Sequence, residues 1–391
     1  MKIRMIDLAA QNQQIHQAVE REMAQVHART SYIGGPQVAQ FEQAFAQFLG
    51  VKKVVGVGSG TDALRLALIA MGVGAGDEVI TVPATFIATA EAIVQAGATP
   101  VFVDVDPLTR NMSPQALRRY LEAGRWKSPN GPRAILPVHL YGLPAAMDEI
   151  MALGRQFNIP VLEDACQAHG ARVCVAGRWM NAGAIGKAGC FSFYPGKNLG
   201  GWGEGGALAT DDEELAERVA RLRDHGRTSH YGHLDCGYNA RLDTIQAVVL
   251  LAKLEHLRVW NARRRELAFS YRTLLGEGLG CELPVEPEGF ESCYHLFAIC
   301  HPRRDLIRHD LLARGIECGI HYPLPLHLQP ALTHLGYRKG DFPVSEMLSD
   351  SVLSLPMHPH LNNLEVLEVV ETISETLTNT AGATEAQRAH S

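Results

Sequence analysis

Apolar, often β-branched runs alternate with stretches of helical periodicity between residues 50 and 210. Gly, Pro or Asp marks the switches between the two patterns. Because a strand followed by a helix usually returns to a parallel neighbour, this order predicts an α/β fold with a mainly parallel, doubly wound sheet. We expect strands at Lys53–Val57, Glu78–Val82, Pro100–Asp104, Ala134–His139, Pro160–Glu163, Cys190–Phe193 and Gly206–Ala209. We expect helices at Thr61–Met71, Phe86–Ala96 and Ala145–Phe157.

The pattern changes after residue 210. Asp211–Asp224 predicts an exposed helix with carboxylates at its N-terminal end, where the helix dipole favours them. Arg241–Leu275 contains no Pro or Gly and predicts one long helix that carries the chain into a smaller unit. Strands at Tyr294–Cys300 and Glu317–Tyr322, around a helix at Asp305–Arg314, predict that this unit is a small C-terminal α+β domain.

The length of 391 residues favours two domains. We expect a large domain over residues 1–250, a small one over residues 251–377, and a disordered tail over residues 378–391, which are small and polar.

Composition excludes several classes of protein. A hydrophobic content of 46% and a charged content of 20% are typical of a globular protein. The chain shows no secretory signal and no run of about 18 apolar residues, so we expect a cytoplasmic protein without a membrane partner. A net charge of −6 disfavours binding to nucleic acid. The eight cysteines form no Cys-x-x-Cys pair, so we expect reduced thiols and no metal site.

Residues 54–68, VVGVGSGTDALRLAL, predict a strand, a Gly/Ser turn and a helix that begins near Gly60 and Thr61. Backbone N–H groups at such a helix start can hold a phosphate. The segment is neither a Walker A loop nor a Gly-x-Gly-x-x-Gly turn. An ordinary tight turn explains it equally well.

Residues 159–171, IPVLEDACQAHGA, predict a strand that ends at Glu163 and Asp164. The carboxyl ends of parallel strands face the ligand crevice, so a carboxylate there suits chemistry, with Gln167 and His169 within reach of the same ligand. The alternative is that Asp164 only caps the following turn.

Residues 189–210 contain Lys197 between a strand and a Gly-rich loop, with Ser192 five residues upstream. A buried lysine can have a lowered pKa and attack carbonyl groups. The alternative is an ordinary exposed lysine.

The three segments together match the needs of pyridoxal phosphate. This cofactor requires a carboxylate at its ring nitrogen, a lysine for its aldehyde and anion donors for its phosphate. Asp164 can supply the first and Lys197 the second. Gly60, Thr61 and Ser192 can supply the third.

At this point the sequence resembles the DegT/StrS-type nucleotide-sugar aminotransferases, a group of fold type I pyridoxal phosphate enzymes. The similarity runs from Ile6 to Leu377. It is carried by YIGGPQVAQFEQAFAQFLGV, GSGTDAL, PATFIATAEAI, EDACQAHGA, FSFYPGKNLG, GYNARLDTIQA, HYPLPLHLQPA and LSLPMHPHL. One departure is GGWGEGG after the lysine, where Trp202 and Glu204 replace the residues that relatives more often carry.

The resemblance implies a role for each matching position. Lys197 is similar to the family's Schiff-base lysine, Asp164 to the partner of the ring nitrogen, and Gln167 to the residue near the ring hydroxyl. Phe86 resembles the aromatic that stacks on the cofactor ring. Asn239 matches the asparagine that reaches the phosphate from the partner subunit, which implies a homodimer with shared active sites.

The resemblance also implies the reaction. An amino acid donor, glutamate, would pass its amino group to the cofactor, with freed Lys197 as the base that moves the α-proton. A nucleotide-linked keto sugar, which we expect to be a 3-keto sugar, would then receive it. Tyr322 and His327 of HYPLPLH are the candidate sugar contacts. Related sugar dehydratases carry histidine at the lysine position, so Lys197 favours transamination.

Two alternatives remain at this stage. One is a pyridoxal phosphate lyase or dehydratase, and the other is a non-catalytic regulator that binds nucleotide sugars. A nicotinamide-dependent sugar enzyme would also fit the strand and helix pattern, but its glycine fingerprint is missing.

Overall fold

A computed structural model describes residues 2–129, 131–276 and 278–388 of the chain. Its central sheet contains β1 (Lys53–Val57), β9 (Gly206–Thr210), β8 (Ala188–Ser192) and β5 (Leu162–Asp164), in that order. A second group has the order β3 (Thr99–Phe102), β2 (Glu78–Thr81) and β4 (Ala134–Ile135). Parallel bridges from Ile135 to Val161 and from Val138 to Asp164 join the two groups.

The sheet is mainly parallel, as the sequence predicts. The strands β8, β5, β4, β2 and β3 run in the same direction. In contrast, β9 runs antiparallel to both β1 and β8. The expected α/β class of the fold type I enzymes is confirmed, and each of the seven predicted strands of this sheet is present. The strand at Ala134 is shorter than expected, because Pro137 has no N–H for a ladder and the chain then turns into η1 (Leu140–Gly142).

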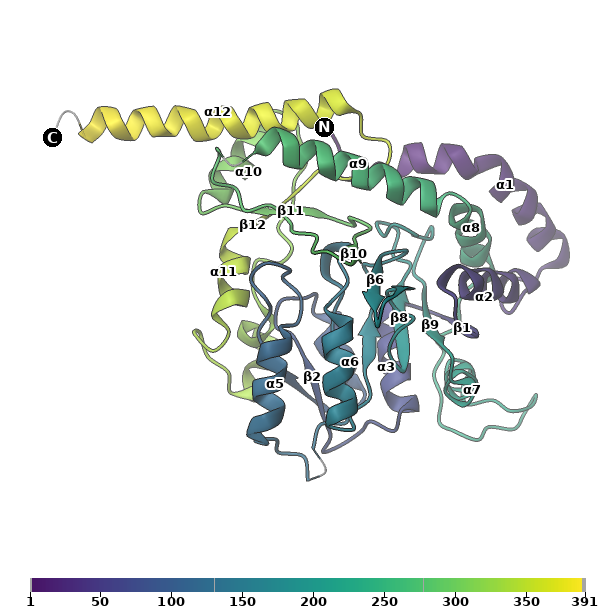
Figure 1. The fold of residues 1–391 in the computed structure, drawn as a ribbon. Coiled ribbons are helices and arrows are strands. Elements are labelled where there is room, and N and C mark those ends of the chain that lie inside the picture. The colour runs from purple at the N-terminus through teal and green to yellow at the C-terminus, as the bar shows by residue number, and fades with distance from the viewer. Residues whose placement is uncertain (1, 130, 277, 389–391) are drawn as a thin grey trace.

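Helices cover both faces of the sheet, because neighbouring strand residues point to opposite sides. Val55 belongs to an apolar core that it shares with α3 (Gly60–Ala70), α4 (Ala88–Gln95) and α7 (Glu213–Leu222). Val54 belongs to a second core, shared with α2 (Pro36–Leu49) and α8 (Thr244–Leu254). Two further helices, α5 (Pro114–Ala123) and α6 (Met147–Gln156), lie on the near side of the sheet in Figure 1, with α3 behind it.

The prediction of one continuous helix over Arg241–Leu275 is wrong, because this segment forms two helices. The first, α8, ends at Leu254, and α9 (Leu257–Leu275) begins three residues later. Tertiary packing overrides the continuous helical pattern here. One helix packs against α2 and α1 (Leu8–Arg29), while the other crosses to the C-terminal helix α12 (Asn363–Arg388).

The C-terminal part has its own core. Its strands β11 (Phe297–Cys300) and β12 (Val352–Leu355) pair antiparallel, beside α10 (Arg304–Ala313) and α11 (Pro343–Ser351). The predicted strand Glu317–Tyr322 is wrong, because only Gly319 bridges to Ser354 and β12 takes the place beside β11. The segment after it forms η2 (Leu326–Leu328) and η3 (Pro330–Leu335).

A small sheet joins the two parts of the chain. The hairpin β6 (Arg172–Val175) and β7 (Arg178–Asn181) pairs with β10 (Phe290–Glu291). Ile3 also packs in the C-terminal core. The boundary near residue 250 remains a prediction, and these contacts tie residues on either side of it together.

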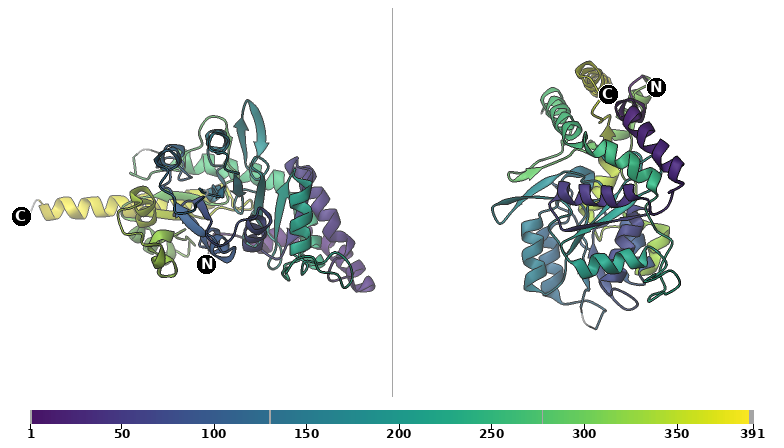
Figure 2. Two further views of the ribbon diagram at one scale, coloured as in Figure 1. Left: turned by 90° about the horizontal axis from the view of Figure 1, so that it is seen from below. Right: turned by 90° about the vertical axis from the view of Figure 1, so that its right-hand side faces the viewer.

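The two terminal helices mark the ends of the molecule. Figures 1 and 2 show α1 at one end and α12 extending from the other. Since α12 runs to Arg388, the segment expected to be a disordered tail continues this helix to that residue, and residues 389–391 lie outside the described part. None of the helices in the described ranges has the length and hydrophobicity to cross a lipid bilayer.

Candidate active site

A cavity of about 550 Å³ lies at the carboxyl ends of the sheet strands. Open parallel sheets bind their ligands at this edge. Residues of the N-terminal segment and of the C-terminal part complete the wall. The predicted residues that line the cavity are Gly60, Thr61, Phe86, Asp164, Gln167, Ser192, Lys197 and Tyr322. The chain therefore brings together predicted residues that are up to 262 positions apart, from Gly60 to Tyr322.

The N-terminus of α3 forms one end of this cavity. Ser59 caps the helix, and its Oγ accepts a hydrogen bond from the Asp62 N–H at 3.0 Å. The first N–H groups of a helix have no partner within it, and those of Gly60 and Thr61 donate to no other group in the part of the chain that the structure describes, so they can bind an anion. A Cβ at Gly60 would lie 2.6 Å from the Cβ of Ser192, so only glycine permits this close approach of helix and strand.

Asp164 ends β5 and is 4% exposed. Its Oδ2 accepts a hydrogen bond from Thr89 Oγ1 at 2.8 Å, and its Oδ1 accepts one from the Cys166 N–H at 3.2 Å. Thr85 Oγ1 lies 3.1 Å from Thr89 Oγ1 and extends this arrangement. The carboxylate is thus held in one orientation and can accept a further proton donor from the cavity. Sequence analysis missed both threonines, although two hydroxyls four residues apart beside the expected aromatic Phe86 were a usable signal.

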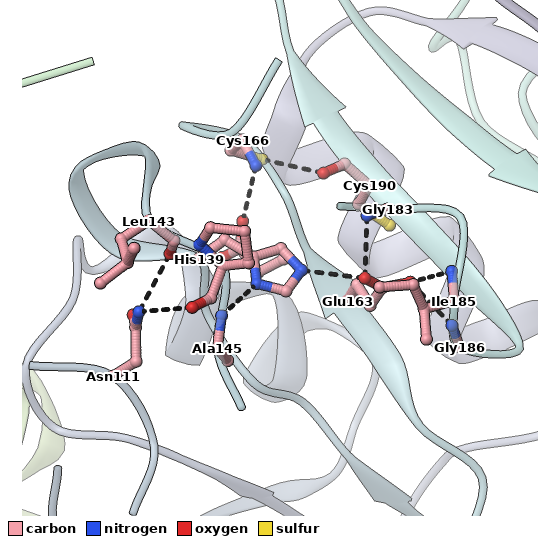
Figure 3. A network of polar contacts seen from close by, with 12 residues as sticks. Asn111, His139, Leu143, Ala145, Glu163, Cys166, Gly183, Ile185, Gly186 and Cys190 are labelled. Atoms are coloured by element: carbon pink, nitrogen blue, oxygen red, sulfur yellow. Dashed lines mark hydrogen bonds and ion pairs between the residues drawn. The ribbon is translucent and has the colours of Figure 1, made fainter. Parts of the chain in front are cut away.

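Glu163, the preceding residue, faces away from the cavity and is fully buried. Its carboxylate accepts backbone N–H groups from Gly183, Ile185 and Gly186 at 2.7–2.8 Å. It also lies 2.9 Å from Nε2 of His139 (Figure 3). Because the Ala145 N–H donates to Nδ1 of that ring at 2.9 Å, the ring proton is on Nε2 and points at Glu163.

This buried pair fixes the loop that supports the site. The His139 N–H donates to the Asp164 carbonyl at 3.0 Å, and the next turn, η1, presents the Tyr141 N–H to Gln167 Oε1 at 2.8 Å. Gln167 Nε2 then donates to Tyr322 OH at 3.2 Å. The amide of Gln167 is therefore oriented by the backbone, with its donor group on the side of the cavity wall.

Phe86 and Tyr322 form an aromatic pair on this wall, with ring centroids 5.6 Å apart. Phe86 is 51% exposed, which is unusual for a phenylalanine outside a binding site. Burial raises the pKa of Tyr322 to about 12, so its hydroxyl stays protonated at neutral pH. The pair offers a flat apolar surface with a polar edge.

Lys197 follows the turn after β8 and is half-buried at the cavity wall. Burial lowers its pKa, while the nearby groups of Cys166 and Asp164 act in the opposite direction. Within the described ranges, no hydrogen bond is made to its Nζ. A larger fraction of this amine is therefore uncharged at neutral pH than for an ordinary lysine, which favours nucleophilic attack and proton transfer.

Three predicted residues lie outside the cavity wall. His169 is fully buried against Phe191 and Phe193, and burial lowers its pKa to about 3. His327 is 2% exposed and pairs with Glu346 at 3.0 Å. Asn239 is exposed, and its Oδ1 accepts a hydrogen bond from Arg241 at 2.7 Å.

The loop after the lysine has one residue in the cavity wall. Glu204 lines the cavity, whereas Trp202 turns away and donates from Nε1 to Asn12 Oδ1 at 2.9 Å. Sequence analysis also missed five further lining residues. Tyr194 and His321 stand in the segments FSFYPGKNLG and HYPLPLHLQPA, whereas Met5, Ile6 and His295 have no motif around them.

Known proteins are similar to this chain in sequence and in fold. A pleiotropic regulatory protein of Geobacillus stearothermophilus is 41% identical over 96% of this chain and 98% of its own length. The UDP-N-acetyl-3-dehydro-alpha-D-glucosamine 3-aminotransferase of Acidithiobacillus ferrooxidans is 42% identical over 96% of this chain and 98% of its own. The solved structure of S. venezuelae DesV in complex with a ketimine intermediate has a TM-score of 0.90 and 41% identity, covering 95% of this chain and 98% of that one.

The expected resemblance is confirmed over nearly the whole sequence, since the family match covers residues 13–374. The expected enzyme class, aminotransferase, is confirmed with it. The cofactor of this family is pyridoxal phosphate, as the three motifs predict. The chain belongs to the DegT/DnrJ/EryC1/StrS aminotransferase family.

Proposed function

We propose that this chain moves an amino group from glutamate to the 3-keto group of a nucleotide-linked sugar, in amino-sugar biosynthesis. The observation that carries the proposal is the half-buried amine of Lys197 in one cavity with the Asp164 carboxylate and the N-terminus of α3. A transaminase needs these three features together, because its cofactor has an aldehyde, a ring nitrogen and a phosphate.

Pyridoxal phosphate, when bound, supplies an aldehyde that combines with amines and a ring that takes up electron density. The cavity fits this group. The N–H groups of Gly60 and Thr61 and the hydroxyl of Ser192 would hold the phosphate. Asp164 would accept a hydrogen bond from the ring nitrogen, and Phe86 would pack against the ring. Gln167 would donate its oriented amide to the ring hydroxyl.

Lys197 acts as the base of the reaction. Its Nζ takes the α-proton from the donor amino acid and later returns a proton to the carbon that bears the new amine. The lowered pKa of this lysine supports the role, because an uncharged amine is required to accept the proton.

The sugar substrate is inferred from relatives and from the wall of the cavity. The A. ferrooxidans relative is named as a 3-aminotransferase for a UDP-linked sugar. Tyr322 lies in the wall with a protonated hydroxyl, and we propose that it contacts the sugar. His327 of the same segment has its Nε2 engaged by Glu346, so Tyr322 is the better supported of the two predicted contacts.

We propose further that the enzyme is a homodimer in which Asn239 reaches the phosphate of the partner subunit. Two observations support this. Asn239 is exposed and does not line the cavity of its own chain. The segment just before it carries Tyr231 and Leu234, which are 87% and 70% exposed, and apolar side chains with this exposure favour burial against another chain.

The test follows each half of the reaction on the cofactor-loaded protein. Glutamate should remove the visible absorbance of the lysine-bound cofactor and yield its keto acid. A UDP- or dTDP-linked 3-keto sugar should then restore the absorbance. If no amino acid removes it, the proposal is wrong.

A second candidate is a regulator that binds nucleotide sugars without catalysis, and the regulatory name of the G. stearothermophilus relative favours it. The presence of both Asp164 and Lys197 in one cavity favours catalysis. Borohydride reduction of the loaded protein, followed by peptide mapping, distinguishes the two. Cofactor attached to Lys197 together with turnover supports the enzyme, and attachment without turnover of any donor supports the regulator.

A further inference from the structure

His295 is a residue of the cavity wall that no motif identifies. It precedes β11 and is 8% exposed. Its Nδ1 lies 3.3 Å from Oδ1 of Asn198, the residue that follows Lys197. The direction of this hydrogen bond determines what the other ring nitrogen, Nε2, offers to a ligand.

The amide of Asn198 has a fixed orientation. Its Nδ2 donates to the carbonyl of Cys293 at 3.0 Å, and a carbonyl oxygen can only accept. The same Nδ2 donates to Asn261 Oδ1 at 3.0 Å. Asn261 is itself oriented, because its Nδ2 donates to the His169 carbonyl at 2.8 Å. The atom of Asn198 that faces the His295 ring is therefore the oxygen.

The tautomer of His295 follows from this orientation. An amide oxygen accepts, so Nδ1 carries the proton and donates it. Burial, and after it the cation of Lys197, lowers the pKa of His295 well below its ordinary range, so the ring is neutral. Nε2 is then a bare acceptor. In the part of the chain that the structure describes, no protein group donates to it.

We infer that His295 is a substrate-binding residue whose Nε2 accepts a hydrogen bond from a donor group of the reactant held beside Lys197. The inference rests on the proposed function. Two other acceptors of the wall are already engaged, since Asp164 Oδ2 accepts a hydrogen bond from Thr89 and Gln167 Oε1 accepts one from the Tyr141 N–H, whereas Nε2 of His295 accepts none among the described residues. The donor group is a hydroxyl of the sugar or the amine of the amino acid, and the same chemistry serves both.

Two substitutions separate this role from a structural one. His295→Asn keeps a donor at the position of Nδ1 for Asn198 but removes the acceptor at Nε2. His295→Gln extends to the position of Nε2 and can place its amide oxygen there. The Gln variant is thus the rescue for the Asn variant.

The experiment measures both half-reactions of each loaded variant under single-turnover conditions. The donor arm uses glutamate, and the sugar arm uses whichever UDP- or dTDP-linked 3-keto sugar the wild-type protein turns over faster. We expect His295→Asn to raise the half-saturating concentration of one reactant about tenfold, the loss typical of one hydrogen bond. We expect His295→Gln to recover most of this loss. Cofactor absorbance and the melting temperature should stay at their wild-type values in both variants.

Each result has one reading. Weakening of the sugar arm alone assigns the donor group to a hydroxyl, and weakening of the glutamate arm alone assigns it to the amine. Wild-type behaviour of His295→Asn in both arms overturns the inference. Joint loss of both arms, cofactor absorbance and melting temperature, without rescue by Gln, also overturns it and leaves only a structural role. If the wild-type protein itself turns over no sugar, the proposed function fails, and the glutamate arm still tests His295.

Discussion

Glu163 and Asp164 are consecutive residues whose carboxylates lie on opposite sides of β5. Asp164 lines the cavity, and Glu163 is buried behind it with three backbone donors and His139. Because successive side chains of a strand point to opposite faces, two neighbouring carboxylates lie in different environments. One is available to a ligand, and the other holds the loops that position the first.

These different roles predict opposite results for two isosteric substitutions. Asp164→Asn should leave the melting temperature close to the wild-type value but lower the rate of transamination by about a hundredfold or more, because the ring nitrogen loses its charged partner. Glu163→Gln should instead destabilise the fold by about 1–3 kcal/mol, since its new amide donor faces groups that also donate. Thermal unfolding and initial rates on the same samples check both. Equal loss of stability in the two variants would contradict the assignment.

Lys197 should be more reactive than an ordinary lysine. Because burial lowers its pKa, its uncharged fraction should reach one half below pH 10.5, the usual value for this group. Competitive acylation of the cofactor-free protein at a series of pH values, read by mass spectrometry of the peptides, measures this. We expect the Lys197 peptide to reach half-maximal labelling at a lower pH than the exposed lysines of the same chain. Coincident curves would show that burial does not activate this amine.

Much of the fold could be predicted from local pattern. The strand Lys53–Val57 is found with the predicted bounds, because its apolar residues are enclosed by a Gly/Ser turn and a polar start. The single predicted helix through Glu255 fails for a reason that no local pattern contains. The change of direction there depends on two different partners, α1 and α2 for the first helix and α12 for the second.

The residues of the site were likewise predictable only where the signal is local in the sequence. Asp164 and Lys197 were predictable because Asp164 ends β5 and Lys197 follows five residues after the end of β8, at the edge of an open sheet where ligands bind. His295 was not, because its tautomer depends on Asn198, which is 97 positions away. The segment ESCYHLFAIC contains one histidine and no motif, so the sequence does not indicate that His295 contacts Asn198. His327 stood in a stronger motif, yet its Nε2 pairs with Glu346 and the ring does not line the cavity.

Lys253 predicts how stability depends on pH. Its side chain is 1% exposed between α1 and α8, and its Nζ has only Gln11 Oε1 as a partner, at 3.3 Å, among the described residues. Burial lowers its pKa to about 8 from 10.5. The folded protein therefore binds fewer protons than the unfolded chain between these values, and this group makes stability rise with pH across that window.

Lys253→Met should remove this penalty. We expect the variant to be more stable than the wild type by about 3 kcal/mol at pH 7, where the folded state must bury the charge or release the proton. The difference should shrink as the pH rises from about 8 toward 10.5. Denaturant unfolding at pH 7 and pH 10 measures both values. If the difference in stability between the variant and the wild type is the same at both pH values, the pKa of Lys253 is not lowered by burial.

The proposed sharing of active sites predicts that two inactive proteins restore each other. In a dimer of Lys197→Ala with Asn239→Ala, one site carries both lesions, and the other combines the intact Lys197 of one chain with the intact asparagine of its partner. Random reassociation of equal amounts should therefore give about a quarter of the wild-type activity, because half of the dimers are mixed and each has one intact site of two. The two variants must be unfolded and refolded together, and each variant unfolded and refolded alone is the control. If Asn239 served its own chain, mixing would yield no more than half of the residual activity of Asn239→Ala.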